Sequence, residues 1–198
     1  MKKWQWLVSS LLMLSSCSAC GHRMQDKIQE IQQDTKAGAE QNRPNLFLAK
    51  KIYVDARFTS EEKTLIREAA KAWEKVTENR VEFLLQFEFP FSEEQPYPYK
   101  SVLVRVGRES AVLEKLPEDF VGGDARTRNS EFLFIIPQRA KDNKEFRTQV
   151  MRLLGQTLGM QDIPDQYPAV LNEKYHEDVD CLTKYDMMQF CALSMCNY

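Results

Sequence analysis

The segment from Val150 to Asp162 constrains the fold most strongly, because it combines a helical apolar pattern with two glycines. Apolar side chains recur at helical spacing along one face of the helix that includes this segment. They are Phe146, Val150, Leu153, Leu154 and Leu158. Asp142 and Glu145 predict the start of this helix as a capping box, and Gly159 predicts its end. We therefore expect a helix with one apolar face that ends at this glycine.

The rest of the chain from residue 47 onward alternates between strand and helix patterns. Short apolar or alternating runs predict strands at residues 51–55, 81–89, 101–106 and 131–136. Thr59 and Glu62 form a capping box that opens a long helix ending near Asn79, and Thr183 with Asp186 opens a short final helix. These elements predict an α+β fold with a long first helix, the helix before Gly159 and a short last helix.

The amino-terminal residues resemble a bacterial lipoprotein signal. Lys2 and Lys3 precede an apolar run, Trp4 to Leu14, that is too short to span a bilayer permanently. The following Leu-Ser-Ser-Cys17 resembles a lipobox, in which Cys17 would be diacylated and become the first mature residue. A plain signal peptide cleaved near Ala19 is the alternative.

We therefore expect a lipoprotein signal peptide at residues 1–16, a lipid anchor with a polar tether at 17–46, and a folded domain at 47–198. This resemblance implies a bacterial cell-envelope protein attached to a membrane by its lipid, and Ser18 favours the outer membrane over the inner one. Removing the signal takes two lysines, so Lys+Arg falls from 27 to 25 against 29 Asp+Glu, a net charge of −4. This net charge argues against a nucleic-acid partner.

Four cysteines remain once Cys17 is assigned to lipid: Cys20, Cys181, Cys191 and Cys196. An even number in an exported chain predicts disulfides, whereas a structural zinc site is disfavoured because the C-x-x-C spacing is missing. If the last helix forms, Cys181 and Cys191 lie roughly 12 Å or more apart along its axis, beyond the reach of about 7 Å between disulfide-bonded Cα atoms. Cys191–Cys196 or Cys181–Cys196 is therefore favoured, with the remaining pair completed by Cys20 or left as free thiols.

Several stretches, and their order, resemble the catalytic domain of matrixin-type metzincins, a family of zinc proteases. KIYVDARFTSEEKTLIREAAKAWEKVTENRVEF resembles the first strand, long helix and second strand of that domain. RNSEFLFIIP resembles the edge strand over the substrate cleft, and RLLGQTLGMQD stands in place of the zinc helix. Ala169-Val-Leu-Asn172 stands where bacterial members carry the Met-turn. The resemblance covers roughly residues 48–196. It implies that the domain at 47–198 is metzincin-like, with a mixed, twisted sheet of about four to five strands.

The family's chemistry is missing from these positions. The resemblance places the zinc ligands on Arg152, Gln156 and Asp162, the general base on Leu153, and the Met-turn methionine on Leu171. A zinc helix needs neutral imidazoles one turn apart and a carboxylate that takes a proton. Arg152 is a permanent cation and Leu153 accepts no proton, so we expect neither zinc nor any other cofactor. We expect Arg152 and Gln156 to form hydrogen bonds across the former site instead, with Asp162 as the nearest partner.

These departures predict a catalytically inactive, metzincin-like domain that binds a protein or peptide. The expected binding element is the strand at residues 131–136, with Phe132, Phe134 and Ile136 as its candidate residues. An exposed strand edge pairs with an extended peptide through backbone hydrogen bonds and needs no metal. The same strand also suits an ordinary covered position, because both of its faces are apolar.

Two alternatives stay open. A divergent metallopeptidase would rebuild a metal site from acidic residues and a histidine that follow the central helix. These candidate ligands are Asp162, Asp165, His176, Glu177 and Asp178. A structural component of an envelope complex would instead use the domain to dock another protein. Zinc content tests the first alternative, and identification of partners tests the second.

Overall fold

A computed structural model describes residues 48–92, 100–107, 110, 113, 116–126, 130–172 and 174–195. The residues predicted to form the signal peptide and the tether lie outside the described residues, as do three cysteines (Cys17, Cys20 and Cys196), so the predictions made for them stay predictions. None of the described helices has the length and apolar character needed to cross a membrane.

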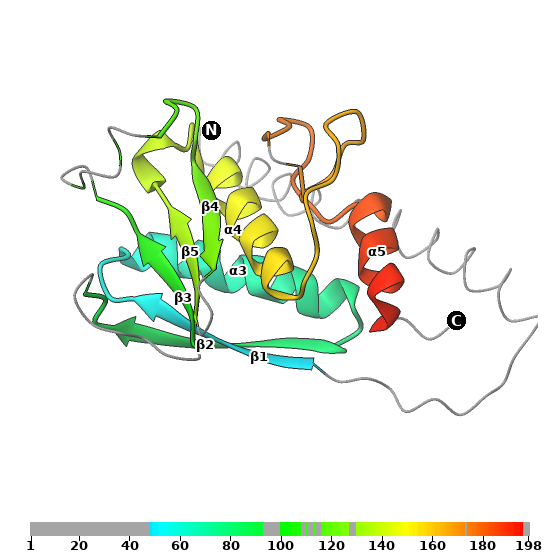
Figure 1. Ribbon diagram of the computed structural model, residues 1–198, viewed down its shortest axis with the longest axis horizontal. Coiled ribbons are helices and arrows are strands. Elements are labelled where there is room, and N and C mark those ends of the chain that lie inside the picture. The colour runs from blue at the N-terminus through cyan, green and yellow to red at the C-terminus, as the bar shows by residue number, and fades with distance from the viewer. Residues whose placement is uncertain are drawn as a thin grey trace, which may run out of the picture. The chain divides into compact units, whose positions relative to one another are not determined.

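The described elements form one mixed sheet with helices packed against it (Figure 1). They are β1 (Leu48–Asp55), α3 (Ser60–Val76), β2 (Val81–Phe89), β3 (Lys100–Arg105), β4 (Gly122–Arg126), β5 (Ser130–Ile135), η2 (Pro137–Arg139), α4 (Asn143–Thr157), α5 (Lys184–Phe190) and η3 (Cys191–Met195). The sheet has five strands in the order β2-β1-β3-β5-β4. All neighbours pair in parallel except β4, which runs antiparallel to β5. The expected fold class is therefore confirmed.

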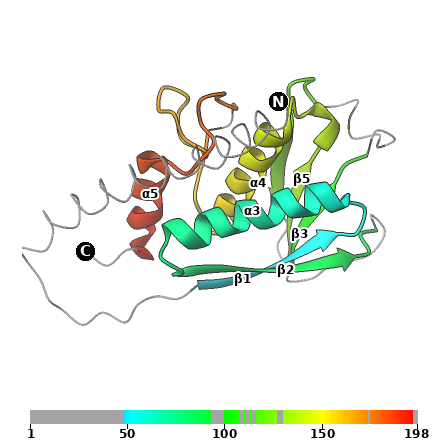
Figure 2. The same cartoon turned by 180° about the vertical axis from the view of Figure 1, so that it is seen from behind.

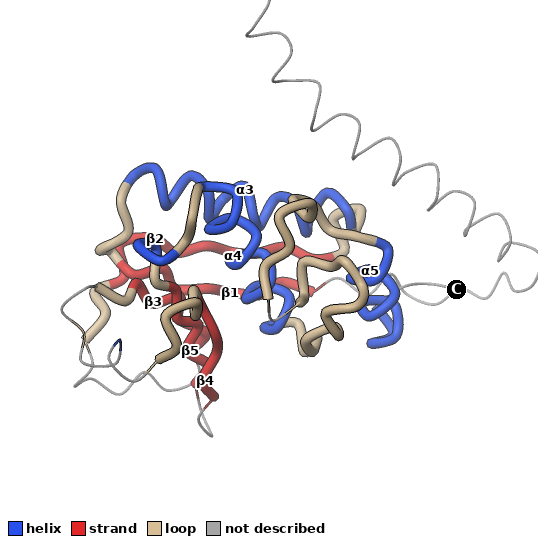
Figure 3. Tube along the Cα trace, turned by 90° about the horizontal axis from the view of Figure 1, so that it is seen from above, coloured by secondary structure: helices blue, strands red, loops and turns tan. Residues whose placement is uncertain are grey.

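Helices α3 and α4 cover the same face of the sheet, as the views from behind and from above show (Figures 2 and 3). The capping box at the start of α3 forms as expected, because Thr59 Oγ1 accepts from the Glu62 amide and Glu62 accepts from the Thr59 amide. Buried side chains of α3, among them Ile66 and Trp73, pack into the core. The Trp73 indole donates to the Met151 carbonyl oxygen of α4 at 2.8 Å, which ties the two helices together.

Helix α4 lies in the middle of the protein and is buried on nearly all sides, which the apolar face alone did not predict. Asp142 caps its start by accepting from the Glu145 amide at 2.8 Å. Gly155 lies so close to its neighbours that a Cβ would come within 2.8 Å of both Leu171 and Trp73. Gly159 follows the helix with φ of +91°, a conformation that favours glycine and ends the helix as expected.

The prediction that residues 131–136 form the edge strand is wrong. β5, which includes Phe132 and Phe134, hydrogen-bonds to β3 on one side and to β4 on the other, and Ile136 is buried just after it. The true edge beside α4 is β4, which the sequence analysis missed. Its residues, Gly-Gly-Asp-Ala-Arg, lack the apolar alternation and β-branched side chains by which strands are recognised. β5 is therefore an interior strand of the sheet, the alternative that its two apolar faces also suggested.

Candidate functional site

The guanidinium of Arg152 lies where the resemblance places a zinc ligand, and it is almost fully buried. Its Nε and Nη2 each donate to Asp162, at 2.9 Å to Oδ1 and 2.9 Å to Oδ2 respectively. Its Nη1 reaches the Gly122 carbonyl oxygen of β4 at 3.3 Å. The side chain of Arg152 is 6% exposed and that of Asp162 is 40% exposed. This two-bond ion pair therefore joins α4, the loop after it and the edge strand, with only the carboxylate open to solvent.

Gln156, one turn further along α4, binds the same carboxylate. Its Nε2 donates to Asp162 Oδ1 at 3.0 Å. The predicted hydrogen bonds of Arg152 and Gln156 to Asp162 are therefore confirmed. The other end of the Gln156 amide, Oε1, is buried and has no hydrogen-bond partner among the described residues. A buried acceptor without a hydrogen-bond partner lowers the stability of the fold by about 1–3 kcal/mol, and such acceptors are rare in folded proteins.

Strand β4 is tied to the end of α4 by a second arginine. Arg126 Nη2 donates to the Gln156 carbonyl oxygen at 2.7 Å. The same guanidinium pairs with Asp124 at 3.3 Å and with Glu131 at 3.1 Å, and the Arg126 side chain is 52% exposed. Sequence reasoning missed both Arg126 and Asp124, because they belong to the strand that it did not recognise.

The outer edge of β4 presents backbone groups to which another strand can bind. The Ile136 amide donates to the Val121 oxygen at 2.8 Å, which fixes the phase of the β4–β5 ladder. Because hydrogen-bonded and non-hydrogen-bonded pairs alternate in an antiparallel ladder, the backbone groups of Gly122, Asp124 and Arg126 point away from β5. The Gly122 carbonyl oxygen accepts from Arg152. Within the described residues, the part of this edge that remains open therefore centres on Asp124 and Arg126.

The turn at residues 169–172, which the resemblance equates with the Met-turn, contacts α4 near this site. Leu171 is fully buried and packs against Gly155. The turn is held by Asp186 of α5, whose carboxylate accepts from the Val170 amide at 3.1 Å and from the Leu171 amide at 2.9 Å. The same carboxylate caps α5 by accepting from the Thr183 amide and hydroxyl. Burial raises the pKa of Asp186, although its hydrogen bonds from Thr183, Leu171 and Val170 act in the opposite direction.

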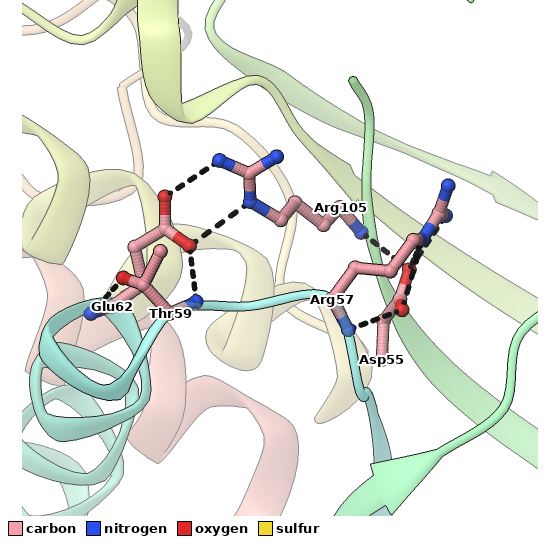
Figure 4. Close-up of polar contacts among 5 residues, drawn as sticks. All are labelled: Asp55, Arg57, Thr59, Glu62 and Arg105. Carbon is pink, nitrogen blue, oxygen red and sulfur yellow. Dashed lines mark hydrogen bonds and ion pairs between the residues drawn. The ribbon is translucent and has the colours of Figure 1, made fainter.

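A second ionic cluster connects the carboxyl ends of β1 and β3 to the start of α3 (Figure 4). The buried Asp55 carboxylate accepts from the Arg57 side chain at 2.7 Å and from the Arg105 amide at 3.2 Å. The Arg105 guanidinium donates to both oxygens of Glu62, at 3.0 and 3.1 Å, and Glu62 also caps Thr59. Each carboxylate of this cluster is bound by an arginine within it, so we assign the cluster to holding the fold together.

The residues of the metal-site alternative are not assembled into one. Asp162 is bound by Arg152, and Glu177 pairs with Lys141 at 2.9 Å. His176 Nε2 is buried without a hydrogen-bond partner in the described part of the chain. Asp165 and Asp178 are exposed. Across the described ranges, no three His, Cys, Asp or Glu side chains are grouped so that they could hold a metal ion.

The residues at the position where the resemblance places zinc also do not fit zinc. Zinc in proteins is bound by neutral imidazole, thiolate or carboxylate. Here a guanidinium and an amide nitrogen both point their hydrogens at Asp162, the one side chain of the three that could ligate a metal. Leu153, in the general-base position, is fully buried in the core.

Cys181 and Cys191, on either side of α5, are both disulfide-bonded cysteines. The predicted final helix exists between them, as α5. Because Cys20 and Cys196 lie outside the described residues, the connectivity that we favour stays a prediction.

Comparisons with known proteins leave the family of this chain unassigned. No protein-family model matches the chain, and no curated protein gives a significant match. Among solved structures, the chain is similar to high choriolytic enzyme 1, a hatching enzyme zinc-protease from the medaka fish Oryzias latipes. The two share 11% identity with a TM-score of 0.44, over 79% of this chain and 94% of that one. A likeness this distant assigns neither a family nor an activity.

Proposed function

We propose that this protein is a catalytically inactive, metzincin-like envelope lipoprotein whose domain binds an extended peptide or a segment of another protein. The observation that carries the proposal is the open edge of β4 next to α4, where the backbone groups of Asp124 and Arg126 point away from β5. An added strand gains main-chain hydrogen bonds there without any metal.

The side chains of α4 support a binding role over a catalytic one. Hydrolysis of a peptide needs an activated water, and the positions that would hold a metal or accept the proton of that water carry Arg152, Gln156 and Leu153. The buried Arg152 guanidinium, paired with the partly exposed Asp162, instead fixes the position of β4 through the Gly122 carbonyl oxygen. A fixed edge strand is suited to binding, because it loses little conformational entropy when a partner strand pairs with it.

A proline at position 124 tests the binding edge. Peptides from a phage-displayed random heptapeptide library, selected on the full chain in detergent, are expected to lose at least tenfold in affinity for Asp124→Pro, because proline removes the outward N–H but no hydrogen bond to β5. Asp124→Ala is the matched control, since it keeps the N–H and removes only the carboxylate. Selection of no peptide, or equal binding to the two variants, would contradict the proposal.

The wild-type chain is expected to contain no stoichiometric zinc after dialysis and to cleave no peptide, for the reasons of residue chemistry given above. Metal analysis by mass spectrometry and a quenched-fluorescence assay on a mixed peptide substrate pool measure the two properties. The triple variant Arg152→His, Leu153→Glu and Gln156→His is the positive control for geometry. It places two imidazoles one turn apart facing Asp162 and should gain weak zinc binding. One zinc per wild-type chain, with peptidase activity, would establish the metallopeptidase alternative.

The lipid anchor and the envelope location rest on the lipobox resemblance. Cys17→Ser is expected to leave the precursor uncleaved and unlipidated, and to move the protein from the detergent phase to the aqueous phase in a phase-partitioning assay. Cys20→Ser, three residues later in the same region, should partition as the wild type does. If the Cys17 variant stayed in the detergent phase, the lipoprotein interpretation would be wrong.

A further inference from the structure

The buried amide of Gln156 carries an acceptor that the protein itself does not use. The residue is 6% exposed, and its Nε2 is fixed by the bond of 3.0 Å to Asp162 Oδ1. That bond also fixes the amide orientation, since a carboxylate accepts only from the nitrogen end. The oxygen of the same amide, Oε1, has no hydrogen-bond partner in the described residues. It lies near Asp162, because the nitrogen of this amide bonds the Asp162 carboxylate.

Asp162 adds a second acceptor with spare capacity. A carboxylate has about four lone-pair sites, and three donors reach this one: Arg152 Nε, Arg152 Nη2 and Gln156 Nε2. Among the described residues, Oδ2 accepts from Arg152 Nη2 alone. The Asp162 side chain is 40% exposed, so a ligand can approach the carboxylate from solvent.

We propose that Asp162 and Gln156 together seat a primary ammonium group of the segment that pairs with β4, either a lysine side chain or a free amino terminus. This inference rests on the proposed function. An ammonium carries three donors on one compact atom, which suits acceptors on two different side chains. A guanidinium suits this site less well, because it favours two oxygens of one carboxylate and Arg152 already uses both oxygens of Asp162.

The exposed cation of Arg126 lies beside the main chain of Gln156. Its Nη2 donates to the main-chain carbonyl oxygen of Gln156 at 2.7 Å, and the same guanidinium pairs with Asp124 and Glu131. Its positive charge opposes a second cation bound at the neighbouring side chain. Removal of the Arg126 guanidinium should therefore strengthen binding of the ammonium.

Three pentapeptides test the seat on the full chain in detergent, with binding measured by calorimetry or by shifts of the protein amide resonances. They are Ac-Thr-Val-Lys-Val-Thr-NH2, the same peptide with norleucine for lysine, and the norleucine peptide with a free amino terminus. The acetylated norleucine peptide is expected to bind about tenfold more weakly than the lysine peptide, the equivalent of one charge-assisted hydrogen bond. Tight binding of the third peptide would identify an amino terminus as the source of the ammonium.

Three variants test which residues cause the preference for the lysine peptide. Gln156→Met keeps the length of the side chain and removes the acceptor, so the tenfold preference for lysine over norleucine should disappear while binding of the norleucine peptide is kept. Gln156→Glu, which places a second carboxylate beside Asp162, should increase the preference, and Arg126→Ala should tighten binding of the lysine peptide. A change of preference distinguishes a binding role from a structural one, because misfolding weakens both peptides equally.

Equal binding of the lysine and norleucine peptides by the wild type would overturn the inference while leaving the proposed function in place. So would a lysine preference that survives in Gln156→Met, because the cation would then bind elsewhere. If none of the three peptides binds and the heptapeptide selection also fails, the proposed function itself is wrong.

Discussion

Asp162→Ala is expected to destabilise the fold by about 3–5 kcal/mol, because it leaves the Arg152 guanidinium buried without a counter-charge. The reverse change, Arg152→Met, should cost less, about 1–2 kcal/mol. It leaves a carboxylate that is 40% exposed and that water can solvate. The asymmetry follows from the unequal burial of the two partners, since the Arg152 side chain is only 6% exposed. Urea denaturation of the full chain in detergent measures both values.

The double variant Arg152→Met and Asp162→Leu separates the charge effect from loss of packing. It removes both charges together, so it should be more stable than Asp162→Ala alone and close to Arg152→Met. Equal losses of stability for Asp162→Ala and Arg152→Met would contradict the conclusion that unequal burial of the two charges sets their contributions. They would mean that the guanidinium finds another carboxylate or reaches solvent when Asp162 is removed.

Asp186→Ala is expected to cost roughly 3 kcal/mol or more, which would make it one of the most damaging single changes in the domain. The variant leaves three backbone amides, those of Val170, Leu171 and Thr183, without their acceptor, at a cost of at least about 1 kcal/mol each. The damage should spread beyond α5, because Leu171 packs against Gly155 of α4. Hydrogen exchange should show faster exchange at Val170 and Leu171 than in the exposed control variant Lys184→Ala.

The charge of Asp186 also predicts how stability depends on pH. Burial raises the pKa of this carboxyl in the folded state, so the folded protein holds the proton more tightly than the unfolded chain does. The resulting stabilisation is complete below the ordinary pKa of about 3.9 and is lost as pH rises through the raised folded pKa. The free energy of unfolding of the wild type, relative to Asp186→Asn, should therefore decrease as pH increases from about 4. A relative stability that increases with pH would show that the hydrogen bonds outweigh burial.

Several elements were predictable because their signals are local. The capping residues Thr59, Asp142 and Thr183 lie directly before the helices α3, α4 and α5. A cap depends on hydrogen bonds within one turn of chain, so the sequence contains everything that decides it. The bonds of Arg152 and Gln156 to Asp162 were also predictable, because a buried cation needs a partner and the metzincin resemblance places all three residues at one site.

The edge of the sheet was not predictable, because it depends on which strands are neighbours in space. β5 is rich in apolar residues and was taken for the edge, yet it lies between β3 and β4. β4 has two glycines and two charged residues among its five, and its strand conformation comes from pairing with β5 rather than from its own side chains. Charged side chains are common on edge strands, where they discourage uncontrolled pairing.

The sequence by itself determined where the helices begin, the general α+β architecture and the side-chain types at positions 152, 153 and 156, because each of these depends on residue type and short-range spacing. Only the tertiary structure decided that β4 is the open edge, that Asp186 holds the turn around Leu171, and that Gln156 Oε1 is buried without a partner in the described residues. Each of these depends on contacts between segments distant in the chain. Such contacts are set by packing of the whole domain, and packing leaves no short-range pattern in the sequence.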